Sequence, residues 1–134
     1  MTPEISIIIP TYAPGELLRM CLDCLEQQTL GKEAYEVCLV LNGDKEPYYA
    51  NIKEYLENYK MKVNLIYSEH KGVSFARNLG IDIAKGKFLT FIDDDDLVSP
   101  NYLEQLSKNS CDNGITVANM IAFRGQVENV ADHY

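Results

Sequence analysis

The stretch Phe88-Leu89-Thr90-Phe91-Ile92 runs without a break into Asp93-Asp94-Asp95-Asp96. Its apolar and β-branched residues predict a strand over residues 88–92. That strand delivers four adjacent carboxyl groups to one point, where like charges repel unless some are protonated or a cation lies among them. Because alternate side chains of an extended segment point the same way, Asp93 and Asp95 are expected to share one side. Two such carboxylates suit Mg²⁺ or Mn²⁺ beside a phosphorylated ligand.

The same acidic run has two other interpretations. It is also typical of a solvated loop, and carboxylates are favourable at the N-terminus of a following helix. The choice between these interpretations depends on what else the fold brings to this point.

Three further runs of strand length precede residue 88. They cover residues 5–9, which Pro10 is expected to end, residues 37–41, followed by the turn pair Asn42-Gly43, and residues 63–67. A fifth strand is predicted over residues 115–118. The runs over residues 5–9 and 37–41 are short and apolar, as expected of buried strands that are covered on both faces.

Helical spacing of apolar residues predicts a helix in each interval. The first covers residues 16–28, with Gly31 as its stop. The second helix is marked by Ile52, Tyr55, Leu56 and Tyr59. In the third, Phe75, Leu79 and Ile83 share one face, and Gly86 is expected to end the helix. A fourth helix is expected to have Ser99 as its N-cap and Pro100 as its first residue, and to end near Ser107.

Strands that alternate with helices predict an α/β fold with a mostly parallel sheet and helices on its faces. Ligands of such sheets bind at the edge formed by the carboxyl ends of the strands. Four loops leave that edge, at residues 10–12, 42–44, 68–72 and 93–96. Their convergence favours a phosphorylated ligand with a metal ion.

Size and charge narrow the class of protein. The chain has 134 residues, enough for one domain over residues 1–134, and its 46% hydrophobic content predicts a packed core. A net charge of −8 argues against a general nucleic-acid or anionic-membrane surface. The pair Cys21 and Cys24 falls inside a predicted helix without a second metal-ligand pair, so reduced thiols and a cytoplasmic location are expected.

Three segments, in this order, resemble the family 2 glycosyltransferases over roughly residues 4–110. They are Ser6–Tyr12, the segment Gly72-x-Ser74-x-Ala76-Arg77-Asn78-x-Gly80, and Ala84-x-Gly86-x-Phe88 through Asp96. The resemblance implies the A-type glycosyltransferase fold, a Rossmann-like three-layer α/β/α sandwich. It also implies an inverting, nucleotide-sugar-dependent transferase of polysaccharide biosynthesis that uses Mn²⁺ or Mg²⁺. A UDP-sugar is the expected donor, and a saccharide or lipid-linked molecule the expected acceptor.

The resemblance also implies roles for single residues. Pro10, Thr11 and Tyr12 would line the nucleotide pocket, with the Tyr12 ring against the base. Asp93–Asp95 would form the family's DxD segment, with Asp95 as the first metal ligand and Asp93 and Asp94 positioning ribose, sugar or metal. Asp96 would cap the following turn.

Two more positions belong to the implied donor site. Arg77 offers a guanidinium fork that matches phosphate, although an ordinary surface arginine is an equal alternative. Gly72 fits a loop that needs positive φ or close ligand approach.

The chain departs from the family pattern in two respects. Leu41 and Asn42 stand where the family usually carries Asp-Asp or Asp-Asn, so the base is not identified, although Asn42 can both donate and accept. No residue matches the family's acidic catalytic base, so the chain is expected to be the donor-binding half of a longer enzyme. Apolar surface toward the missing half leaves self-association and a peripheral membrane contact open.

Two other classes of protein compete with this interpretation. A non-catalytic module that binds nucleotides or divalent cations would explain the missing base. A receiver or phosphatase-type domain would carry its key carboxylates after the first strand, where this chain has Pro10-Thr11-Tyr12, and is disfavoured.

Overall fold

A computed structural model describes residues 2–110 and 114 of the chain. The elements are, in chain order, β1 (Ile5–Tyr12), α1 (Glu16–Glu26), the 3₁₀ turn η1 (Lys32–Ala34), β2 (Tyr35–Asn42), α2 (Tyr48–Leu56), β3 (Lys62–Ser68), α3 (Val73–Ile83), β4 (Phe88–Phe91) and α4 (Tyr102–Asn109). The predicted strand over 115–118 and Cys111 lie outside the described residues. Within that part of the chain, no helix is long and apolar enough to cross a membrane.

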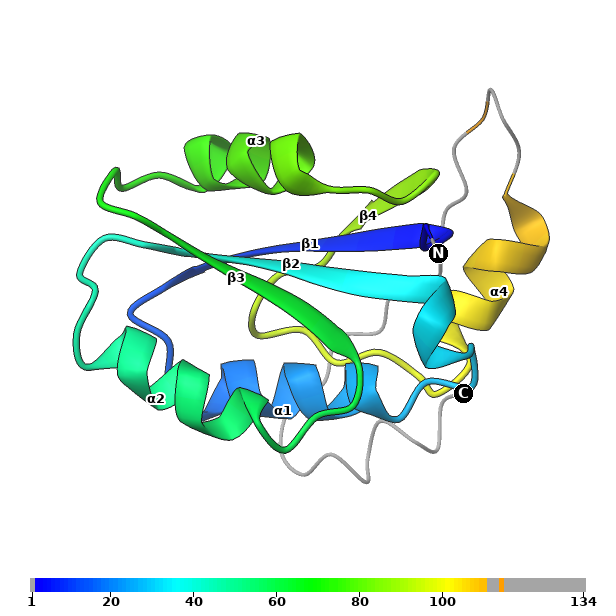
Figure 1. Ribbon diagram of the computed structural model, residues 1–134, viewed down its shortest axis with the longest axis horizontal. Helices are drawn as coiled ribbons and strands as arrows, with labels where there is room; N and C mark the ends of the chain where they lie inside the picture. The colour runs from blue at the N-terminus through cyan, green and yellow to red at the C-terminus, as the bar shows by residue number, and fades with distance from the viewer. Residues whose placement is uncertain (1, 111–113, 115–134) are drawn as a thin grey trace.

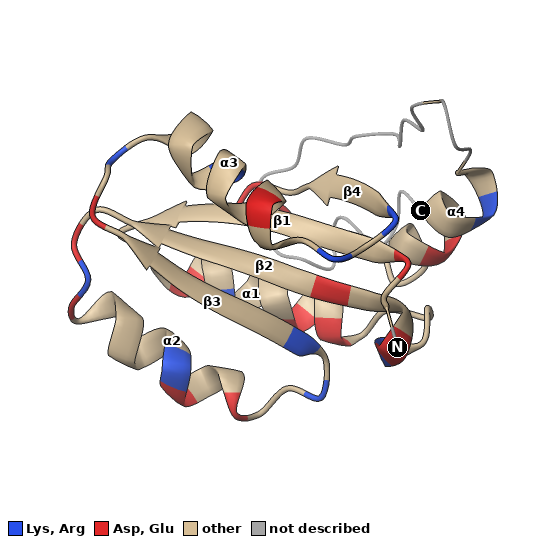
Figure 2. Cartoon of the chain, turned by 45° about the horizontal axis from the view of Figure 1, so that its top comes forward, with Lys and Arg blue, Asp and Glu red and all other residues tan. Residues whose placement is uncertain are grey.

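The four described strands form one parallel sheet in the order β3-β2-β1-β4. Helix α3 lies on one face of the sheet, and α1 and α2 lie on the other (Figure 1). Figure 2 shows β1 and β2 in the middle of the sheet, with β3 and β4 on either side. The predicted α/β class and three-layer sandwich are therefore confirmed.

The main core lies between the sheet and α1. Ile7 and Ile9 of β1 pack there with Leu22 and Leu25 of α1, and all four are fully buried. The amphipathic pattern of α1 predicts this contact, because its apolar residues recur at helical spacing. Cys21 and Cys24 of α1 and Cys38 of β2 carry free thiols, as predicted.

Strand β1 does not end at Pro10, as its sequence suggested, but continues to Tyr12. The Ile92 N–H donates to the Ile8 carbonyl, so the backbone of Ile8 faces β4. By alternation Pro10 faces the same side, where β4 has already ended at Phe91. Proline, which has no N–H, is tolerated there because β4 no longer offers a carbonyl that an N–H at this position would pair with.

The buried face of α3 also differs from the prediction. Ala76 and Gly80 face the sheet, whereas Phe75 is 41% exposed and stacks on the His70 ring. A Cβ at Gly80 would lie 2.5 Å from Cγ2 of Ile8, so the helix approaches the sheet too closely for larger side chains. Close helix packing, which the apolar spacing alone does not reveal, decides which face is buried.

Three predicted helix boundaries were wrong. Helix α1 ends at Glu26 with Gln27 as its C-cap, and Gly31 instead opens the 3₁₀ turn. Helix α3 ends at Ile83 rather than Gly86. Helix α4 starts at Tyr102 with Asn101 as N-cap, not at Pro100 after a Ser99 cap.

A long-range contact explains the displaced start of α4. The Gln28 amide donates to the Ser99 carbonyl at 2.8 Å, and its oxygen accepts from the Leu103 N–H at 2.9 Å. The Thr29 N–H donates to the Pro100 carbonyl. These bonds tie the segment after the aspartates to the end of α1, so the carboxyl groups project from a fixed backbone.

Candidate functional site

A cavity of about 460 Å³ opens at the carboxyl edge of the sheet, where ligands of α/β proteins bind. It is lined by Pro10, Thr11, Tyr12, Asn42, Lys71, Gly72, Val73, Asp93, Asp94 and Asp95. The convergence of the four loops is thus confirmed. Lys71 and Val73 were not predicted, and Arg77 lies outside this lining.

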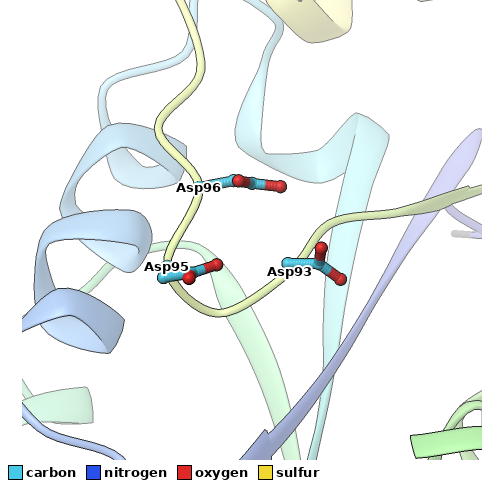
Figure 3. Close-up of side chains that lie close together, drawn as sticks. All are labelled: Asp93, Asp95 and Asp96. Carbon is cyan, nitrogen blue, oxygen red and sulfur yellow. The ribbon is translucent and has the colours of Figure 1, made fainter. Parts of the chain in front are cut away.

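Three carboxyl groups gather on one side of the acidic turn. Asp93, Asp95 and Asp96 each offer one oxygen, and these oxygens lie within 4.8 Å of one another (Figure 3). Asp93 and Asp95 therefore share a side, as predicted, and Asp96, which was expected to cap the following turn, lies with them. Partial burial and the charges of Asp93 and Asp95 raise the pKa of Asp96.

These three residues form the acidic cluster, and its donor set fits a divalent cation. Carboxylate oxygens are the hard ligands that Mg²⁺ and Mn²⁺ prefer. All three side chains are exposed, which leaves room for water or a ligand oxygen in the coordination shell.

Asp94 makes a different contact. Its carboxylate accepts a hydrogen bond from the Thr11 hydroxyl at 2.6 Å, which joins the end of β1 to the acidic turn. Burial raises the pKa of Asp94, and the neighbouring Asp95 and Asp93 raise it further, whereas the Thr11 hydrogen bond acts to lower it. Asp94 is therefore oriented by the protein, whereas the acidic cluster faces solvent.

Arg77 lies beside the acidic cluster. Its Nη2 atom is 3.3 Å from an Asp93 oxygen, across two partly exposed side chains. Its Nε atom is buried, and no hydrogen-bond partner reaches it within the described part of the chain. The guanidinium offsets part of the negative charge at this edge of the sheet.

Asn42 joins two loops of the site. It is only 3% exposed, and its amide nitrogen donates to the Thr11 carbonyl at 2.8 Å. Its amide oxygen accepts from the Gly72 N–H at 3.3 Å. Sequence reasoning treated Asn42 as a reader of the base and missed this bridging contact, because nothing local signals a partner thirty residues away.

Two glycines shape the wall around Tyr12. Gly72 has φ 138° and precedes α3, which confirms the predicted positive φ. Gly43 has φ 91°, and a Cβ there would lie 2.4 Å from Cε2 of Tyr12. The Tyr12 ring is 51% exposed, and Nζ of Lys71 lies 5.8 Å from its centre. The cavity thus combines an aromatic ring, an ammonium group and the acidic turn.

Comparison with known proteins identifies the family to which this chain belongs. The model of the family described as "Glycosyl transferase family 2" matches residues 6–134. Glycosyltransferase YibD of Escherichia coli is 36% identical over 117 residues, covering 87% of this chain and 33% of YibD. The chain therefore spans about a third of the length of this relative.

Solved structures show the same fold. Staphylococcus aureus TarS in complex with UDP matches with a TM-score of 0.71 at 24% identity, over 78% of this chain and 31% of that one. The mannosyltransferase PcManGT from Pyrobaculum calidifontis, solved with GDP-Man and Mn²⁺, matches with a TM-score of 0.66 at 23% identity, over 72% and 29%. The fold is the A-type glycosyltransferase fold.

Proposed function

Because the chain belongs to glycosyl transferase family 2, we propose that its cavity binds a nucleotide diphospho-sugar as the donor of a glycosyl transfer. The transfer is inverting, and the acceptor is a saccharide or a lipid-linked molecule. The UDP in TarS and the GDP-Man and Mn²⁺ in PcManGT support a donor of this class. We assign no catalytic base within the described residues.

The residues take the following parts in this proposal. The Tyr12 ring contacts the base, because an aromatic face stacks on any base. Asp95 and Asp93 hold the divalent cation, and Asp94 contacts the ribose or the sugar. Such a cation, when bound, stabilises the negative charge of the departing nucleoside diphosphate.

The remaining site residues shape and charge the pocket. Pro10 and Thr11 form one wall, and Asn42 and Gly72 hold the facing loops together. Arg77, through its place beside Asp93, adds positive charge near the diphosphate.

One observation carries the proposal: the acidic turn and the exposed Tyr12 ring line the same cavity. The Thr11 to Asp94 hydrogen bond fixes the end of β1 against that turn. A nucleotide diphospho-sugar could therefore place its phosphates on the cation and its base on the Tyr12 ring. Neither the acidic turn nor the tyrosine alone would support this arrangement.

A thermal-shift screen tests the proposal. UDP-, GDP-, CMP- and dTDP-sugars are added to the chain with and without Mn²⁺. A ligand at about one hundred times its Kd stabilises a protein by about 2.7 kcal/mol, which raises Tm by several degrees. We expect at least one diphospho-sugar to raise Tm, and only with Mn²⁺ present.

Two matched variants locate the effect. Asp95→Asn should abolish the Mn²⁺-dependent rise while Tm without ligand stays within about 2 °C of native, since surface substitutions change stability little. Asp82→Asn makes the same change on the exposed surface of α3 and should keep the rise. If no sugar nucleotide raises Tm, or if Asp95→Asn responds like the native chain, the proposed site is wrong.

A further inference from the structure

Asn42 lines the cavity, but two contacts within the protein already fix its side chain. Its amide nitrogen donates to the Thr11 carbonyl, and its oxygen accepts from the Gly72 N–H. A base can use only the one N–H and the one lone pair that these contacts leave. Other polar residues of the lining are therefore candidates for discriminating between bases.

Lys71 is placed to do so. It lines the cavity from the loop between β3 and α3, and its Nζ lies 5.8 Å from the centre of the Tyr12 ring. Among the described residues, Tyr12 supplies the only aromatic ring in the lining of this cavity. A base held against Tyr12 would therefore have the Lys71 ammonium beside it.

Lys71 is not held by the acidic turn through an ion pair. Among the described residues it makes no ion pair with Asp93, Asp94 or Asp95, whereas Arg77 pairs with Asp93 at 3.3 Å. In the proposed complex, the guanidinium of Arg77 lies near the diphosphate, and the Lys71 ammonium lies near the aromatic ring.

An ammonium group only donates hydrogen bonds. Uracil and guanine present carbonyl oxygens, whereas cytosine and adenine present an amino group at the corresponding place, which also donates. We propose that Lys71 selects sugar nucleotides whose base carries a carbonyl oxygen at that edge over those that carry an amino group. This inference rests on the proposed function and adds the residue that sets donor specificity.

Calorimetric titration with UDP and CDP in the presence of Mn²⁺ tests the inference, because the two nucleotides differ only at the pyrimidine edge. The native chain should bind UDP about tenfold or more tightly than CDP. In Lys71→Met the two affinities should come within about threefold of each other, through a loss for UDP and no loss for CDP. GDP against ADP gives a second pair with the same expected change.

Lys45→Met is the matched control. Lys45 also lies over aromatic rings in a loop at this sheet edge, with Nζ 4.8 Å from the Tyr49 ring centre, but it is not part of the cavity lining. It should keep the native preference for UDP. The comparison therefore separates a contact with the base from a general loss of positive charge.

Three results would overturn the inference while leaving the proposed function intact. They are equal binding of UDP and CDP by the native chain, an equal loss of both nucleotides in Lys71→Met, which would place the ammonium on the diphosphate, and an unchanged preference in Lys71→Met. Failure of the native chain to bind any of the four nucleotides would instead refute the proposed function, and this inference with it.

Discussion

Replacing Asn42 with leucine should lower both the free energy of unfolding of the chain and its affinity for UDP. The substitution keeps the approximate side-chain volume but removes the donor to the Thr11 carbonyl and the acceptor of the Gly72 N–H. The lost hydrogen bond to the buried Thr11 carbonyl costs about 0.5–1.5 kcal/mol, and the lost bond to the exposed Gly72 N–H, which can regain water, costs about 0.5–1. The free energy of unfolding should fall by about 1–2.5 kcal/mol, which lowers Tm by roughly 3–12 °C.

The assay pairs urea unfolding with calorimetric titration of UDP in Mn²⁺. Asn51→Leu makes the same chemical change on the exposed surface of α2 and should alter the free energy of unfolding by less than about 0.5 kcal/mol. Because Asn42 ties the Tyr12 end of β1 to Gly72, UDP affinity should also fall in Asn42→Leu. A Tm within 2 °C of native, with unchanged UDP affinity, would refute the bridging role of this side chain.

Three other substitutions test the remaining contacts. Arg77→Ala should weaken Mn²⁺-dependent UDP binding by about 1.5–3 kcal/mol if its guanidinium meets the diphosphate, and an unchanged calorimetric affinity would leave it only a partner of the acidic turn. Thr11→Val should weaken the same binding about three- to tenfold by releasing Asp94, and an equal affinity would show that this orientation does not matter. Glu36→Gln should lower the free energy of unfolding by about 1–3 kcal/mol at pH 7, because hydrogen bonds outweigh burial and hold the pKa of Glu36 below its usual value. In urea unfolding, that difference should persist above about pH 4.5 and shrink as the pH falls through the lowered pKa, and the exposed control Glu57→Gln should change the free energy of unfolding by less than about 0.5 kcal/mol at pH 7.

The sequence was sufficient where the structure depends on local pattern. Apolar runs and helical spacing predicted the first four strands and the helices between them, and the α/β rule placed their loops at one edge. That rule brought Tyr12, Gly72 and the aspartate run to the same edge, and all of them line the cavity. These features follow from periodicity or from residue types that tolerate few conformations, such as Gly72.

The sequence was insufficient where contacts join distant residues. Gln28 fixes the start of α4 through Ser99 and Leu103, and Asn42 bridges Thr11 and Gly72. Such pairs leave no periodic pattern in the sequence, because their residues come together only when the chain folds.

The two edges of the sheet, formed by the amino ends and the carboxyl ends of its strands, show why the acidic turn is suited to a ligand rather than to stability. At the amino end, Glu36 is 1% exposed and accepts hydrogen bonds from the Ser6 hydroxyl, the Asn64 amide and the Lys85 N–H. A buried charge is stable only with partners of this kind, and here the protein supplies them all.

At the carboxyl edge, Arg77 is the one positive partner of the acidic cluster among the described residues, and the three carboxyl groups of the cluster are exposed. The proposed cation, if bound, would relieve their mutual repulsion. The protein supplies partners for the buried charge at the amino edge of the sheet, so it could also supply them at the carboxyl edge. The incomplete pairing of the acidic cluster therefore argues that a ligand supplies the remaining partners there.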